Sequence, residues 1–165
     1  MKISSFFLSL TVLGLISIGF NSCSHPPKHD SGYQDGREWG MKLRDDIVED
    51  YEVAHYISEK LSDTMREGFQ TGFADGFGEN GQEIIEIIFE AVETEDFEEG
   101  QRTGEKLDEG TVTDILVRDY IVANRVKSEV KRAGWRFGFI IGYQNAGNTY
   151  KEGEAVYRSI ESSIF

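Results

Sequence analysis

Two segments of this chain carry a glycine at every fourth position and an aromatic residue directly after each glycine. They read Gly68-Phe69, Gly72-Phe73, Gly76-Phe77 and Gly134-Trp135, Gly138-Phe139, Gly142-Tyr143. A glycine inside a helix costs about 1 kcal/mol relative to alanine. Three in succession therefore imply a compensating contact that a side chain would block. The close approach of a second helix backbone is such a contact.

Helix geometry turns this spacing into a groove with a ridge beside it. Residues at i, i+4 and i+8 stay near one line along a helix, and the residue after each lies about 100 degrees further round. The glycines then form a groove and the aromatic residues form a parallel ridge. We expect the two segments to pack against each other as a pseudo-symmetric pair, with each ridge in the other segment's groove. This makes the twelve residues above the expected helix-packing seam.

The two halves of the chain share further residues, which indicates an internal duplication. The matching stretches are Gly36-x3-Gly40-x-Lys42-Leu43 with Gly100-x3-Gly104-x-Lys106-Leu107, and Asp50-Tyr51-Glu52-Val53-Ala54 with Asp119-Tyr120-Ile121-Val122-Ala123. We interpret residues 31–80 and 95–147 as diverged copies of one helical hairpin-like unit. Chance similarity between two helical segments is the alternative.

Helical periodicity runs through both copies, and no proline follows Ser31. Apolar or small residues at steps of three and four predict a long helix over residues 39–73, which a capping pair at Asp46 and Glu49 would divide into a short and a long helix. A second long helix is predicted over residues 112–141. The sequence thus predicts an all-α helix bundle built from a duplicated unit with GxxxG packing.

Shorter elements fill the spaces between and after the copies. Turn residues at 78–81 end the first copy. Residues 83–92 read as a helix because glutamates recur at helical steps, although the β-branched run within 84–89 also suits a strand. A capping box from Thr149 to Glu152 predicts a short last helix.

The chain begins with Met1-Lys2, an apolar run to Phe20 and then Asn21-Ser22-Cys23. This order is typical of a secretory signal. We therefore expect residues 1–22 to be a signal peptide, residues 23–30 a tether and residues 31–165 a single helical domain.

Two resemblances follow from these features. The signal ending at Cys23 resembles that of a bacterial lipoprotein, although Phe20 and Asn21 depart from the usual pattern. This resemblance implies lipidation of Cys23 and an extracytoplasmic, membrane-anchored protein. An uncleaved anchor and an ordinary secretory peptide are the alternatives, and both also place the domain outside the cytoplasm. The GxxxG runs resemble glycine-zipper segments of envelope proteins, but polar residues interrupt both runs, which disfavours a membrane pore.

The charge of the chain limits its partners. The net charge of −13 disfavours nucleic acid and anionic lipid. The membrane would be reached through the lipid anchor, and a protein partner in the envelope or a homo-oligomer fits better. Solubility alone is the simpler explanation of the charge.

Two charged faces are candidates for interaction. One is acidic and includes Glu86, Glu90 and Glu93, and the other is a stripe of Arg118, Arg125, Arg132 and Arg136. Arginine forks suit phosphate or carboxylate ligands. A salt-bridge seam between the stripe and the acidic segment 83–109, or a solvated face, is the alternative that we favour.

The sequence predicts no catalytic residue, no cofactor and no metal site. His55 is a formal general base, but its counterpart in the proposed second copy is Asn124, which cannot do the same chemistry. The carboxylates at 45–50 lack the spacing of an EF-hand. We expect a non-catalytic, lipid-anchored envelope protein that acts as a helical interaction or structural module. The alternative is an acidic inhibitor or immunity-type lipoprotein that binds a basic extracytoplasmic enzyme.

Overall fold

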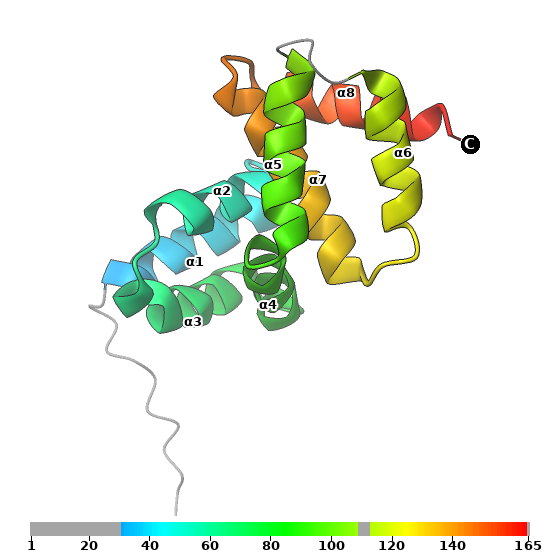
Figure 1. Cartoon of the computed structure of the whole chain (residues 1–165). Helices are drawn as coiled ribbons and strands as arrows, with labels where there is room; N and C mark the ends of the chain where they lie inside the picture. Colours follow the sequence, from blue (N-terminus) through cyan, green and yellow to red (C-terminus); the bar gives the residue numbers. More distant parts are fainter. Residues whose placement is uncertain (1–30, 109–112, 165) are drawn as a thin grey trace, which may run out of the picture.

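The computed structural model describes residues 31–108 and 113–164, and all regular structure in them is helical (Figure 1). The helices are α1 Ser31–Arg44, α2 Asp50–Lys60, η1 Asp63–Met65, α3 Arg66–Phe77, α4 Gly81–Val92, α5 Glu95–Asp108, α6 Asp114–Asn124, α7 Glu129–Asn145 and α8 Tyr150–Ser162. The predicted all-α helix bundle is confirmed. Cys23 and the rest of the predicted signal peptide and tether lie outside the described residues.

The long helix predicted over residues 39–73 is instead three helices and a short 3-10 turn. α1 ends in a Schellman motif, in which the Ile47 N–H donates to the Lys42 carbonyl at 2.9 Å and the Asp46 N–H donates to the Leu43 carbonyl at 3.2 Å. Asp46 takes the left-handed conformation that this motif requires, with φ 54°. α2 then starts after Glu49, whose N–H donates to the Glu52 carboxylate at 2.9 Å. The break lies where the capping pair was predicted, but Asp46 ends a helix rather than starting one.

The long helix predicted over residues 112–141 is also divided. α6 ends at Asn124, and α7 begins after Ser128, which has extended backbone angles at the helix start. The shorter predictions are correct. Residues 84–89 belong to helix α4, Gly78 ends α3 with a positive φ of 91°, and the Thr149 capping box starts α8.

The glycine runs pack within each copy, so the prediction that they pack against each other is wrong. α3 lies along α1, and α7 lies along α5. A Cβ added to Gly72 would lie 2.0 Å from the Tyr33 carbonyl oxygen, and one added to Gly138 would lie 2.0 Å from the Phe97 carbonyl oxygen. Backbone therefore fills each groove, and no aromatic ridge enters it.

Glycines on the opposing helices complete these two contacts. A Cβ on Gly36 would lie 2.1 Å from the Phe69 carbonyl oxygen, and one on Gly100 would lie 2.2 Å from that of Trp135. Contacts advance in the same direction along both helices of each pair, so α1 and α3 run parallel, as do α5 and α7. The predicted hairpin-like unit is thus a parallel pair joined through α2 or α6.

The aromatic ridges form rows of stacked rings beside the glycine contacts. Ring centroids lie 6.3 Å apart for Phe69 and Phe73, and 5.4 Å apart for Trp135 and Phe139. Phe73 stacks on Phe77 in turn. Apart from Phe77 and Tyr143, which are half-buried, these rings belong to the buried core.

The packing extends each repeated unit by one helix, to α1–α4 and α5–α8. α4 packs on α2 and α3 as α8 packs on α6 and α7. α1 and α5 each have 14 residues, and α2 and α6 each have 11. Tyr56 stacks on Phe69 as Tyr120 stacks on Trp135. Tyr120 therefore corresponds to Tyr56, which corrects the predicted match between the two Asp-Tyr-x-Val-Ala stretches.

Helix α7 makes the main contact between the two units. α7 packs against α2 and α4 of the first unit, in addition to α5 and α8 of its own (Figure 1). Arg136 of α7 reinforces this contact, because its Nη1 donates to Asp50 of α2 at 3.2 Å. The α2 and α4 surface of the first unit is thereby covered.

Candidate functional site

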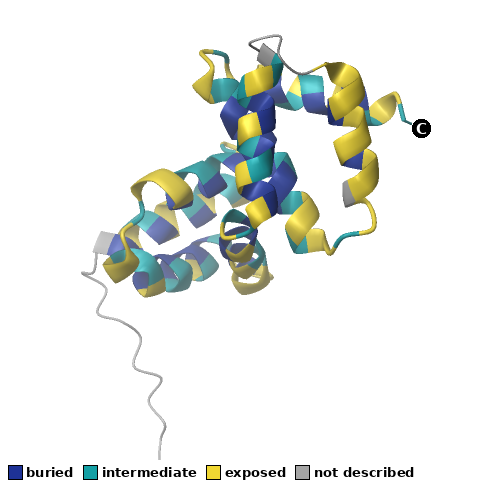
Figure 2. Cartoon of the chain, in the orientation of Figure 1, coloured by how far each residue is buried: buried dark blue, intermediate teal, exposed yellow. Residues whose placement is uncertain are grey.

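Helix α6 carries apolar residues on two opposite faces. Val117 and Ile121 point inward, with 0% and 4% of their surface exposed. Ile115, Val122 and Val126, on or just beyond α6, are 69%, 46% and 92% exposed. A helix that is apolar all round normally has both sides covered by protein. Figure 2 shows that α6 is instead largely exposed, with only isolated buried positions.

In α2, the corresponding helix of the first unit, other helices cover the apolar residues. Tyr51, Val53, Ala54 and Ile57 of α2 are all buried. They lie in a helix that packs on α4 and on α7. α6 has α8 in the place of α4. In the described part of the chain, however, no second helix packs along α6 as α7 packs along α2.

Exposed apolar side chains are concentrated at this place. Among the described residues, the large apolar side chains that are exposed are Met41, Ile47, Ile115, Leu116, Tyr120, Val122 and Val126. All but Met41 and Ile47 belong to α6 or follow it directly. We call the stripe of Ile115, Val122 and Val126 the outer face of α6. Exposed apolar residues that gather on one element mark interaction surfaces.

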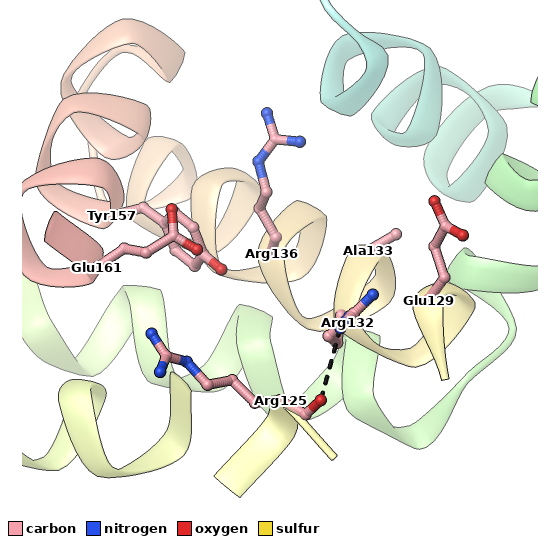
Figure 3. A pocket seen from close by; sticks show the side chains of 7 residues that line it. All are labelled: Arg125, Glu129, Arg132, Ala133, Arg136, Tyr157 and Glu161. Atoms are coloured by element: carbon pink, nitrogen blue, oxygen red, sulfur yellow. Dashed lines mark hydrogen bonds between the residues drawn. The ribbon is translucent and has the colours of Figure 1, made fainter. Parts of the chain in front are cut away.

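Three of the four stripe arginines lie around one cavity beside the end of α6. This cavity has a volume of about 540 Å³ and is lined by Arg125, Glu129, Arg132, Ala133, Arg136, Tyr157 and Glu161 (Figure 3). Arg118 lies apart from it and lines a smaller cavity between α6 and α8, of about 190 Å³. The predicted stripe is therefore divided between two places.

Acidic groups offset the arginine charges around the larger cavity. Arg136 contacts Asp50 at 3.2 Å and Glu154 at 3.6 Å, while Glu129 and Glu161 line the cavity itself. Figure 3 shows the Glu161 carboxylate beside the Tyr157 ring. The number of carboxylates is at least equal to that of the guanidinium groups. This arrangement does not form a strong anion-binding site.

Burial and the charged groups around the cavity shift the pKa of Tyr157. Burial and, to a lesser extent, the nearby Glu161 raise the pKa of Tyr157 to about 12, although the three arginines of the cavity oppose the rise. The phenol is therefore neutral at physiological pH. It offers a hydrogen-bonding hydroxyl and no charge to the cavity.

The predicted salt-bridge seam between the arginine stripe and the acidic segment is wrong in its main contact. Arg136 pairs with Asp50 and Glu154, which both lie outside residues 83–109. Two ion pairs of the acidic segment use cations outside the stripe. Arg66 pairs with Glu93, and Lys127 pairs with the buried Asp96.

The rest of the acidic face stays at the surface. Glu86 is exposed and accepts a hydrogen bond from Gln82 at 2.6 Å, and Glu90 is exposed one turn further along α4. Glu83 is exposed as well. This part of α4 is a solvated face, one of the readings that the sequence left open.

His55 lies away from the α6 surface. Its Nδ1 is hydrogen-bonded to the Tyr150 hydroxyl, and burial lowers the pKa of the imidazole. A polar cavity of about 440 Å³ is lined by Tyr150 but not by His55. The histidine therefore holds α8 against α2 and does not face this cavity.

Metal and membrane criteria add two observations on the described residues. No group of three or more histidine, cysteine or acidic side chains is arranged there to hold a metal ion. None of the helices in those ranges has both the length and the hydropathy of a membrane span.

Comparison with protein-family models, curated proteins and solved structures found no match.

The sequence reading missed the outer face of α6. Its signal was present, because the run Ile115-Leu116-Val117 and the run Tyr120-Ile121-Val122 each place apolar residues on both sides of a helix. The periodicity over residues 112–141 instead predicts one long helix with Val122 and Val126 on its apolar face. The end of α6 at Asn124 and its register against α8 leave them outside instead.

Proposed function

We propose that this protein is a non-catalytic helical interaction module, held at a membrane surface by a lipid on Cys23. The outer face of α6 is the surface through which it binds another protein. The observation that carries this proposal is the contrast between the start of α2, where Tyr51 and Ala54 are buried, and α6, where the corresponding Ile115 and Arg118 are exposed. Because helices α7 and α8 cover that place in the first unit, we infer that the occupant at α6 is also helical.

Energetics support an occupant at this surface. Burying apolar surface contributes about 25 cal/mol per Å², so three exposed branched side chains forgo a substantial stabilisation in the isolated chain. Charged residues flank the stripe, with Arg118 and Arg125 on one side and Asp119 on the other.

A photo-cross-linking residue placed at Val122 or Val126 tests this proposal in the envelope fraction of a bacterial host. A matched control carries the same residue at Arg102, which is exposed on α5. We expect a discrete cross-linked adduct from α6 and none from α5. Equal labelling from both helices, or no adduct at α6, would count against the α6 surface.

The anchor is tested separately. We expect the wild-type chain to incorporate a radiolabelled fatty acid and the Cys23→Ala variant to incorporate none. Equal labelling of the two proteins would reject lipidation at Cys23 and would leave the α6 proposal unaffected.

The exposed carboxylates of α4 favour a second candidate, an acidic inhibitor of a basic extracytoplasmic enzyme. Glu83, Glu86 and Glu90 are all exposed. Such a partner would cross-link from α4 rather than α6, and would dissociate as ionic strength rises.

A further inference from the structure

The sequence of α6 is self-complementary about its centre. Residues 115–122 read Ile-Leu-Val-Arg-Asp-Tyr-Ile-Val. Three apolar residues stand on each side of a central pair of opposite charges, Arg118 and Asp119. Reversing the direction of the segment exchanges the two charges and leaves the apolar pattern unchanged.

The self-complementary residues that matter share the outward side of the helix. Ile115, Arg118, Asp119 and Val122 follow the i, i+3, i+4, i+7 spacing of a single helical face. All four are exposed, whereas Val117 and Ile121 on the opposite side are buried. The outer face therefore presents an apolar residue at each end and two opposite charges between them.

We propose that the helix on the outer face of α6 is α6 of a second copy of this chain, running antiparallel across a two-fold axis. The axis passes between Arg118 and Asp119. Arg118 of each copy then lies opposite Asp119 of the other, and Ile115 lies opposite Val122. This inference rests on the proposed function, since it names the partner at the same surface.

A two-fold contact of this kind is isologous and closes on itself, so it gives a dimer and no filament. The head-to-tail alternative would place α3 and α4 of a second copy beside α6, as α7 and α8 lie beside α2. When Phe69 is equated with Trp135, α3 has Thr71 and the exposed Asp75 where α7 has the buried Phe137 and Ile141. α3 thus lacks the apolar residues that this place requires.

The contact is small, because a single helix of 11 residues from each copy forms its centre. We therefore expect a dissociation constant in the micromolar range, as for other small interfaces. Anchoring two copies on one membrane would raise their effective concentration and favour the dimer there.

Three charge variants test the pairing. R118D and D119R each replace both reciprocal ion pairs with like-charge pairs, whereas the double variant R118D/D119R restores them with the signs exchanged. Both positions are exposed, so the fold should persist, and circular dichroism checks this. The matched control is R102E, an exposed charge reversal on α5.

Sedimentation equilibrium of the full chain in a density-matched non-ionic detergent measures the association. We expect each single variant to weaken dimerisation at least about tenfold. The double variant and R102E should stay near wild type. Mixing the two single variants should produce a heterodimer, because aspartates at 118 and 119 in one chain then face arginines at 118 and 119 in the other.

Three outcomes would overturn the inference: a wild-type chain that stays monomeric at about 100 µM, a dimer that the single variants leave unchanged, and single variants that fail to associate when mixed. A monomeric chain that still cross-links another protein through Val122 would reject the self-association and keep the proposed function. A chain that neither dimerises nor cross-links another protein through Val122 would reject both proposals.

Discussion

Replacing Gly138 with alanine tests the contact that joins α5 to α7. The added Cβ would lie 2.0 Å from the Phe97 carbonyl oxygen and 2.9 Å from both the Phe97 carbonyl carbon and the Gln101 nitrogen. All three atoms are backbone, so no side chain can rotate away. Ordinary contact begins near 3.4 Å, and the two helices would have to separate by roughly 1.4 Å to reach it.

Two opposing effects set the magnitude. Alanine is the better helix former by about 1 kcal/mol, which alone would stabilise the variant. Overpacking typically costs about 1–3 kcal/mol and sometimes more. Here separation of the helices also loosens the neighbouring contacts at Gly100, Gly104 and Gly142. We expect a net loss of about 2 kcal/mol in the free energy of unfolding.

Urea unfolding followed by circular dichroism measures this loss. With a slope of about 1–2 kcal/mol per molar urea, the midpoint should fall by about 1–2 M. The matched control is G153A, also within a helix, where an added Cβ would lie 3.1 Å from the Ile140 carbonyl oxygen and 3.3 Å from the Tyr143 Cβ. We expect G153A to stay within about 1 kcal/mol of wild type. A G138A midpoint equal to or above that of wild type would refute the close-approach argument.

Two further predictions concern polar contacts between helices. Arg136→Met leaves the carboxylates of Asp50 and Glu154 close together without their shared guanidinium. We expect a loss of about 1 kcal/mol that shrinks in high salt, measured by urea unfolding at two ionic strengths; an equal loss at both would point to packing instead. Burial lowers the pKa of His55, so the unfolded chain binds its proton more readily and stability must fall as pH drops below the unfolded pKa of about 6.5. His55→Gln should flatten that part of the pH profile of unfolding, and an unchanged profile would contradict the assignment.

Elements with local signals could be predicted from the sequence. The α8 capping box depends on Thr149 and Glu152, three residues apart, and the end of α3 depends on the positive φ of Gly78. Such motifs are complete within a few residues. The glycine runs likewise predicted that a backbone comes close, because only that contact offsets the cost of glycine in a helix.

The identity of that backbone could not be predicted from the runs themselves. Gly36 and Gly40 were recognised as a repeat marker, yet they are also the glycines that α3 packs on. When a glycine run occurs in two similar segments, each run could pack on a helix of its own segment or on the other run. The pattern alone does not distinguish these two arrangements. The long-helix predictions failed for a related reason, since an apolar period continues through the Schellman motif at Asp46 and does not reveal it.

The outer face of α6 could not be predicted from the sequence, because its exposure depends on which helices pack on α6. α7 packs on α2, but among the described residues no helix packs along α6 in the same way. α6 nevertheless has Ile115 and Val122 on its open side, with an opposite pair of charges midway between them. Apolar residues alone would fit any helical partner, and only the central Arg118-Asp119 pair makes the segment complementary to its own reverse.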